Sequence, residues 1–147
     1  MRQDDTAELE ALLGAVRALY GAIERFDGRV AAALGIDRTA LRAVNAMEAG
    51  AVSPTRLGGE LGLASGSVTA LLDRLERAGH VERVAAADDR RRRDARLTAS
   101  ARRAADAAYG RLGAAIGQAF ADAPPEEIAA ARDAVARLAH AFDAAAR

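Results

Sequence analysis

The most concentrated charge in the chain is a run of four arginines, Arg90 to Arg93. The chain has 147 residues and a formal net charge of zero, with 21 arginines, 21 acidic residues and no lysine. The charge is uneven: residues 51–103 hold eleven arginines and seven acidic residues, whereas the segments on either side carry a small acidic excess. A local excess of arginine is where a polyanion is expected to bind. The neutral total therefore does not exclude a nucleic-acid partner.

A second set of polar residues shares one face of a helix predicted over residues 65–78. Apolar residues at helical spacing define the buried face of that helix: Val68, Leu71, Leu72 and Leu75. The opposite face carries Gly66, Ser67, Thr69, Ala70, Asp73, Arg74 and Arg77. Hydroxyl groups such as those of Ser67 and Thr69 can hydrogen-bond to bases or phosphates, and Arg74 and Arg77 suit phosphates.

Capping signals place this helix after a shorter one. Ser53-Pro54 is typical of an N-cap followed by a first helical residue, and the short helix ends at Gly62. Leu63-Ala64 form a turn, and Ser65 is expected to cap the next helix, which ends at Gly79. Gly58 lies four residues before Gly62, where a small residue lets the second helix cross closely.

The helical spacing then changes to an extended pattern. Val81 to Val84 predicts one strand, residues 85–94 form a polar tip, and Ala95 to Thr98 predicts the return strand. Two short helices joined by a tight turn and followed by a hairpin indicate a winged helix-turn-helix.

Longer helices are predicted on both sides of this motif. The first carries an apolar seam at spacings of three and four residues: Leu9, Leu12, Val16, Leu19, Ile23, Phe26 and Val30. Asp37 is the expected N-cap of a second helix that ends at Gly50, and Thr98 or Ser100 is the expected cap of a long helix that stops at Pro124-Pro125. The last helix follows Asp122 or Ala123 and carries a wider apolar stripe: Ile128, Val135, Leu138 and Phe142.

Composition favours long helices over a thick core. Alanine supplies 41 residues, only five residues are aromatic, and there is no Trp. Alanine has the lowest cost in a helix, and helices sharing a seam between two chains suit this composition. We predict a mainly α fold with a small β-hairpin wing (α+β), in which residues 1–34 and 101–147 form a helical dimerisation region and residues 35–100 form the winged helix-turn-helix lobe.

Several classes of site are disfavoured. The chain has no cysteine, which excludes disulfides, thiolate ligands and thiol nucleophiles. His80 and His140 lie far apart without a carboxylate cluster of metal-ligand spacing, and no phosphate loop or catalytic triad stands out. We therefore expect no enzyme activity, no metal and no cofactor. We also expect a cytoplasmic protein without a membrane partner, because no secretory signal or long apolar stretch is visible.

Residues 65–83, Ser-Gly-Ser-Val-Thr-Ala-Leu-Leu-Asp-Arg-Leu-Glu-Arg-Ala-Gly-His-Val-Glu-Arg, followed by Asp89-Arg90-Arg91 and then Leu97-Thr98, carry a family resemblance. With this combination at this spacing the chain resembles the MarR family of bacterial transcription regulators, over essentially its whole length. The resemblance implies a homodimer held by the N- and C-terminal helices, binding double-stranded DNA at a pseudo-palindromic operator.

The resemblance also implies roles for single residues. In the wing it makes Arg91 the residue that enters the minor groove and Asp89 the carboxylate that orients it. An arginine in a narrow minor groove meets concentrated negative potential, and a carboxylate two residues earlier can hold its guanidinium by a paired hydrogen bond. The alternative for Arg90 to Arg93 is a solvated loop that touches only phosphates. The predicted DNA-binding residues are Ser65, Gly66, Ser67, Thr69, Ala70, Arg74, Arg77, Asp89, Arg90 and Arg91.

The sequence departs from the family pattern at two of these positions. Relatives often carry larger polar or basic side chains where this chain has Gly66 and Ala70, so direct base readout is expected to depend on Ser67, Thr69 and main-chain contacts, with more weight on DNA shape.

Ligand control is a further implication of the resemblance. Relatives commonly bind small aromatic or phenolic molecules between the dimer helices and the DNA-binding lobe, and the candidate lining residues here are Arg17, Tyr20, Arg42 and Met47. Core packing accounts for the same residues equally well. We expect a repressor that such a ligand releases. The alternative is a helical structural or adaptor protein that binds a protein partner and no DNA.

Overall fold

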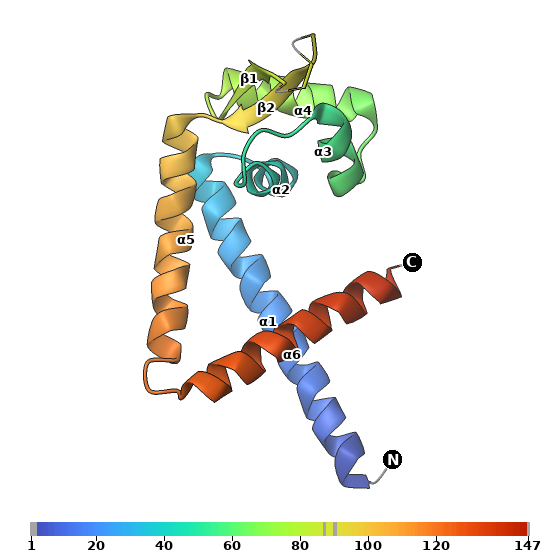
Figure 1. Cartoon of the computed structure of the whole chain (residues 1–147), viewed down its shortest axis with the longest axis vertical. Coiled ribbons are helices and arrows are strands. Elements are labelled where there is room, and N and C mark those ends of the chain that lie inside the picture. The colour runs from blue at the N-terminus through green and yellow to red at the C-terminus, as the bar shows by residue number, and fades with distance from the viewer. Residues whose placement is uncertain (1–2, 87, 90, 147) are drawn as a thin grey trace. The chain divides into compact units, whose positions relative to one another are not determined.

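The computed structural model describes residues 3–86, 88, 89 and 91–146. Six helices and one hairpin follow in the order α1–α4, β1, β2, α5 and α6 (Figure 1). Their bounds are α1 Gln3–Leu34, α2 Arg38–Ala46, α3 Pro54–Leu61, α4 Ser65–Arg77, β1 Val81–Ala85, β2 Arg93–Leu97, α5 Ala99–Ala119 and α6 Pro125–Ala145. The chain divides into two compact units, residues 1–107 and 108–147. The prediction of a mainly helical fold with a β-hairpin wing is confirmed.

The lobe, defined here as α2, α3, α4, β1 and β2, has its own apolar core. Leu57 of α3 and Leu72 of α4 are completely buried, and so is Met47 just after α2. The predicted apolar face of α4 is the buried one. Burial of large aliphatic side chains is the main source of stability in a domain of this size, so this core is the main contribution of the chain itself to the stability of the lobe.

The hairpin is antiparallel, with Val81 opposite Leu97 and Ala85 opposite Arg93. A short third segment joins its edge, because Val52 and Ala95 exchange backbone hydrogen bonds of 2.8 and 2.9 Å. At its base the Thr98 hydroxyl donates to the Gly79 carbonyl at 2.8 Å, and the Thr98 amide donates to the His80 carbonyl. These bonds fix the wing to the end of α4.

Most of the predicted caps are confirmed. Asp37 accepts from the Ala40 amide, Ser53 from the Arg56 amide, and Thr98 from the Ala101 amide. Gly62 and Gly79 adopt positive φ angles of 68° and 76° where α3 and α4 end, a conformation that favours glycine.

Several predicted boundaries are wrong. Helix α5 ends at Ala119, ahead of the predicted stop at Pro124-Pro125. Ala64 is the N-cap of α4, and Ser65 is its first residue without a capping bond. Helix α2 ends at Ala46, and a turn precedes Gly50. The return strand begins at Arg93, because the ladder continues to the Ala85–Arg93 pair. Pro124 is the N-cap of α6, and the helix begins at Pro125. Proline suits this place because the first N–H groups of a helix have no partner within the helix.

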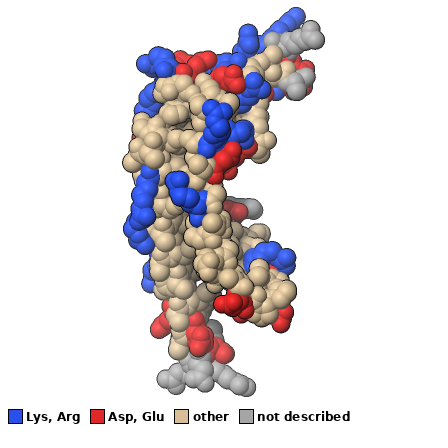
Figure 2. All heavy atoms as spheres, turned by 90° about the vertical axis from the view of Figure 1, so that its left-hand side faces the viewer, with Lys and Arg blue, Asp and Glu red and all other residues tan. Residues whose placement is uncertain are grey.

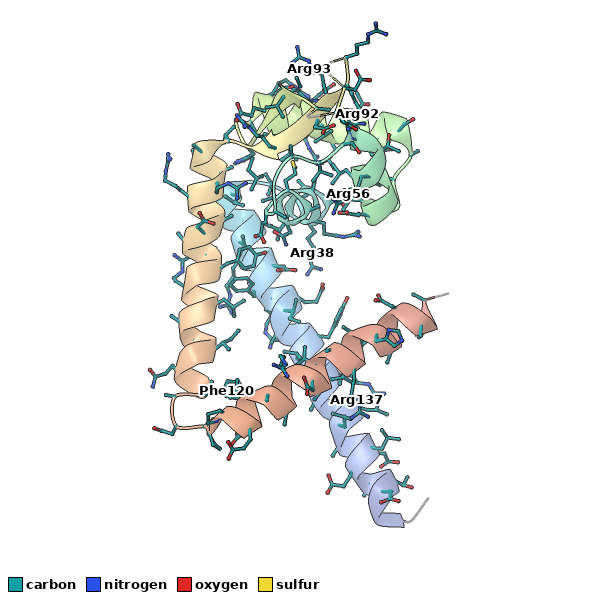
Figure 3. The ribbon with its side chains drawn as sticks, viewed as in Figure 1. Arg38, Arg56, Arg92, Arg93, Phe120 and Arg137 are labelled. Carbon is teal, nitrogen blue, oxygen red and sulfur yellow. The ribbon has the colours of Figure 1, made fainter. Side chains whose placement is uncertain are left out.

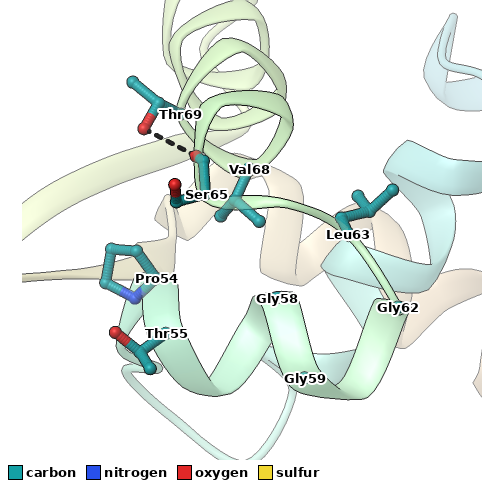
Figure 4. A pocket seen from close by; sticks show the side chains of 9 residues that line it. All are labelled: Pro54, Thr55, Gly58, Gly59, Gly62, Leu63, Ser65, Val68 and Thr69. Carbon is teal, nitrogen blue, oxygen red and sulfur yellow. Dashed lines mark hydrogen bonds between the residues drawn. The ribbon is translucent and has the colours of Figure 1, made fainter.

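Gly58 lies where α3 meets α4 (Figure 4). A Cβ atom at this position would lie 3.1 Å from the Leu63 carbonyl oxygen and 3.3 Å from Cγ2 of Val68. The prediction that a small residue is needed at this crossing is confirmed.

The long helices differ from the lobe in burial. In α1 the apolar seam becomes fully buried only near its end, at Val30, whereas Leu9, Leu12, Leu19 and Ile23 are about half exposed. Helix α6 has no buried residue. Within the described part of the chain, none of the helices is apolar and long enough to span a membrane.

Candidate nucleic-acid interface

The exposed face of α4 begins with small side chains. Gly66, Ser67 and Ala70 are all exposed, as predicted for a surface that meets a partner. Thr69 is exposed too, but its hydroxyl donates to the Ser65 carbonyl one turn earlier at 3.1 Å (Figure 4). The donor of Thr69 is thus already used, and the oxygen lone pairs remain as acceptors.

Arg74 lies farther along the same face and is held by a residue from outside α4. Its Nη2 lies 2.6 Å from Oδ2 of Asp37, the N-cap of α2. The other oxygen of Asp37 accepts from the Ala40 amide at 2.8 Å. The hydrogen bond from Ala40 and the positive charge of Arg74 lower the pKa of the Asp37 carboxyl, against the opposing effect of partial burial. Asp37 therefore stays ionised and connects the start of α2 to α4.

Arg77 and Arg83 have different surroundings. The Arg77 side chain is exposed, and its Nε donates to the Asp73 carbonyl at 3.3 Å within α4. Arg83 of β1 reaches back to α4, with 2.9 Å to Oδ1 of Asp73 and 3.7 Å to Oε2 of Glu76. The Arg83 side chain is only 23% exposed, so this pair of contacts anchors the wing to α4. Sequence reasoning placed Arg83 in the strand and missed this role.

In the wing, Arg92 has a structural role. It pairs with Asp88 at 2.7 Å and with Asp94 at 3.3 Å, while its carbonyl accepts from the Ala86 amide. The hydrogen bond to Asp94 and the charge of Asp88 raise the pKa of the Arg92 guanidinium. Figure 3 shows Arg92 and Arg93 near the hairpin. Arg92 thus closes the base of the tip.

The Asp89 carboxylate binds the backbone of Arg91, whereas it was expected to pair with the Arg91 guanidinium. Oδ1 of Asp89 accepts from the Arg91 backbone amide at 2.9 Å. Among the described residues, no carboxylate pairs with the Arg91 guanidinium, so the expected Asp89–guanidinium pair is absent here. The carboxylate orients the backbone of the tip, and the exposed Arg91 side chain remains available to a partner. The candidate Arg90 lies outside the described residues.

A groove of about 460 Å³ runs along the exposed face of α4. It brings together four of the predicted DNA-binding residues: Ser67, Ala70, Arg74 and Arg77. The carboxylate of Asp37 lies in the same groove. Ser65 and Thr69 line a neighbouring groove of about 490 Å³ between α3 and α4 (Figure 4). Figure 2 shows arginine and acidic side chains close together at the upper end of the molecule. The groove along α4 likewise combines Arg74 and Arg77 with the carboxylate of Asp37.

The candidate ligand residues are in different environments. Arg17 and Tyr20 are exposed on α1. Arg42 is exposed on α2, and its Nη2 donates to the Glu60 carbonyl at 3.3 Å. Met47 is completely buried in the lobe core, where packing alone accounts for it. Within the described residues, no group of three or more metal-ligating side chains is found.

Comparison with known proteins finds relatives for the segment that contains the lobe. Residues 34–92 match the model of the MarR family. Over this segment the chain is similar to the winged helix-turn-helix of MarR proteins. YcgE of Bacillus subtilis (strain 168), an uncharacterized HTH-type transcriptional regulator, is 47% identical over 68 residues, which is 46% of this chain and 44% of YcgE. The chain thus spans less than half the length of this relative.

Solved structures extend the likeness in fold over nearly the whole chain. A MarR family protein from Bacillus stearothermophilus is 23% identical, with a TM-score of 0.72 over 97% of this chain and 99% of its own. YusO of Bacillus subtilis is 20% identical, with a TM-score of 0.65 over 96% and 99%. NadR, solved with 4-hydroxyphenylacetate, is 22% identical, with a TM-score of 0.61 over 86% and 90%. At these identities the likeness concerns the fold, which is that of MarR proteins.

Proposed function

We propose that this protein is a transcription regulator that binds double-stranded DNA. The main support is the exposed face of α4, where small residues precede Arg74 and Arg77. The wing beside it carries Arg91, whose guanidinium has no carboxylate partner among the described residues. In winged helix-turn-helix proteins the second helix of the motif enters the major groove, and phosphate contacts fix its orientation. Exposed arginines next to small side chains fit that arrangement.

The same face argues for recognition through DNA shape. Gly66 and Ala70 offer no side-chain hydrogen bond, and the Thr69 donor is used within α4. Ser67 and the Thr69 oxygen are the direct contacts left to base edges, and Arg91 in the minor groove would read groove width. Sequence preference would then depend on how easily the site adopts a narrow minor groove.

Dimer formation is part of the proposal. Exposed apolar side chains on α1 and α6 are the candidate dimer surface, and residues 1–34 and 101–147 form the proposed dimerisation region. Leu12, Ile23 and Phe142 belong to this set. A two-fold dimer places its two α4 helices about one DNA turn (~10 bp) apart, which gives a pseudo-palindromic operator.

Repression with ligand release completes the proposal. NadR holds the phenolic acid 4-hydroxyphenylacetate, which supports a phenolic effector for this chain as well. Arg17, Tyr20 and Arg42 are the exposed candidates to contact it. Met47 lies in the lobe core and could contact a ligand only if the core opened. A ligand that prefers one spacing of the two lobes would shift the population away from the DNA-binding state.

Fluorescence anisotropy with labelled DNA from the region flanking its own gene tests the proposal. We expect binding that tightens as salt is lowered, with the logarithm of the binding constant falling linearly with the logarithm of salt concentration. A shuffled duplex of the same length is the control, and specific binding should exceed it by roughly 10³-fold or more. Failure to bind any fragment at low salt would favour the adaptor alternative.

A further inference from the structure

Asp37 is an acidic residue within the proposed DNA-binding groove. It lines the groove along α4 together with Ser67, Arg74 and Arg77. A carboxylate in such a place repels the phosphate backbone, so its presence requires a reason other than DNA contact. The role of Asp37 as N-cap of α2 supplies one reason, but asparagine or serine would cap as well.

The Asp37 carboxylate makes a second contact in addition to the cap. One oxygen of Asp37 accepts from the Ala40 amide, and the other lies 2.6 Å from Nη2 of Arg74. The cap fixes the carboxylate, and the carboxylate in turn fixes the Arg74 side chain. The Nε of Arg77, three residues later, donates to the carbonyl of Asp73 in its own helix. Arg74 thus differs from Arg77 in that its ion pair connects α4 to the N-cap of α2.

The pair is also exchangeable. The side chains of Arg74 and Asp37 are 54% and 50% exposed, so water and salt reach both of them. Exposed ion pairs contribute little net stability, which means that another anion can replace the carboxylate at small cost. Arginine binds carboxylate and phosphate oxygens with the same forked geometry. A DNA phosphate arriving at α4 offers Arg74 an equivalent partner.

We propose that Asp37 is a positioning residue that holds Arg74 against the lobe in the unbound protein and yields it to a phosphate of the DNA backbone. This inference rests on the proposed function. Asp37 thereby lowers the affinity for DNA of any sequence, since each binding event must break the Asp37–Arg74 pair. The contact is also a physical link between the start of α2, which follows α1, and the DNA-binding face of α4.

The test uses the full-length protein and four variants: Asp37→Asn, Asp37→Ser, Arg74→Ala and Asp37→Asn/Arg74→Ala. Both replacements of Asp37 retain a good N-cap and remove the charge, and circular dichroism checks that each variant folds. Binding to the operator fragment and to the shuffled duplex is measured by anisotropy over a salt series. Glu24→Gln is the control, because Glu24 of α1 forms another partly exposed ion pair, with Arg38, which lies away from α4 (Figure 3).

We expect Asp37→Asn to bind both duplexes roughly two- to fivefold more tightly, the range of one exposed ion pair. Arg74→Ala should reduce the salt slope by about one unit, as for the loss of one phosphate contact. In the Arg74→Ala background the gain from replacing Asp37 should be clearly smaller, because only the repulsion between the carboxylate and the phosphates is then removed.

Three results would overturn the inference. They are weaker binding by Asp37→Asn and Asp37→Ser, an equal gain with and without Arg74, and an unchanged salt slope for Arg74→Ala. Each is read against wild-type protein that does bind DNA. Absence of binding by the wild type would instead contradict the proposed function, so the two failures are distinguishable.

Discussion

The lobe and α6 differ in how far their large apolar side chains are buried. In the lobe, Leu57 and Leu72 are completely buried by other residues of the same chain. On α6, Val135 is 56% exposed and Phe142 is 58% exposed, although both belong to one helical stripe. A row of exposed large apolar residues is typical of a surface that another protein covers. The lobe is therefore stabilised within the chain, whereas α6 is expected to depend on a partner chain.

The charged residues repeat this contrast. In the lobe, Arg83 connects β1 to α4, and Arg92 connects the two sides of the wing tip. On α6 the pair Arg132–Asp133 joins adjacent residues of the same helix. Ion pairs thus position the DNA-binding elements of the lobe, and the proposed contact of α6 is apolar.

The largest expected effect comes from placing charge on the α6 stripe. The double variant Val135→Asp/Phe142→Asp should be monomeric, because two carboxylates would be buried in the proposed dimer contact. Loss of the second half-site should weaken operator binding by roughly 10²- to 10⁴-fold. Sedimentation velocity and anisotropy measure the two effects. Arg132→Ala is the control, and a double variant that remains dimeric would contradict the assignment of α6.

Leu72→Ala tests the core of the lobe. Truncation of a fully buried leucine should lower the free energy of unfolding by about 2–5 kcal/mol, since it removes apolar contacts and leaves a cavity. Urea titration at several protein concentrations measures this loss. The matched variant is Leu12→Ala on α1, where the side chain is 46% exposed within one chain. Its cost should grow with protein concentration, and a concentration-independent cost would place Leu12 in an intramolecular core.

The features of the fold that depend on residues close together in the chain could be predicted from the sequence. Asp37, Ser53 and Thr98 were predicted as caps because capping depends on bonds between neighbours a few residues apart. The buried face of α4 followed from its 3.6-residue period for the same local reason. The start of α4 was misplaced by one residue because Ser65 is a good cap by type, although the chain turns at Ala64.

Contacts between distant segments were not predictable in this way. Nothing in the spacing of Asp37 and Arg74 indicates that they meet, and the pairing of Arg83 with Asp73 exists only once β1 lies against α4. For the wing, the resemblance suggested that Asp89 would hold the Arg91 guanidinium, whereas it accepts from the Arg91 amide. Which donor a short acidic side chain selects depends on the backbone of the turn, which the residue types do not determine.

Arg91→Ala tests the wing. We expect operator binding to weaken by about 1–3 kcal/mol, the scale of a specific contact. The effect should be larger on operators with A·T-rich flanks, where the minor groove is narrow and its potential most negative. Anisotropy on operators with A·T-rich and G·C-rich flanks measures this difference. Equal losses on both, with the salt slope reduced by about one, would show that Arg91 contacts only phosphate.

The smallest effects are expected from a matched pair of glycines in α3. Alanine at Gly58 would meet the Leu63 carbonyl oxygen and the Val68 side chain, both tighter than ordinary contact, so the α3–α4 crossing must shift. We expect a loss of about 1 kcal/mol in the free energy of unfolding. Alanine at Gly59 meets nothing within 4 Å and should stabilise the helix by about 0.4–1 kcal/mol.

Thermal and urea unfolding of Gly58→Ala and Gly59→Ala therefore separate packing from helix propensity, because both changes add one methyl group to the same helix. If the two variants shift stability in the same direction, the close approach at Gly58 does not constrain the lobe. If the two variants shift the free energy of unfolding in opposite directions, the close approach at Gly58 constrains how α4 packs on α3. The position of the exposed face of α4 depends on that packing. The Gly58 variant should then also weaken DNA binding, while the Gly59 variant should leave it unchanged.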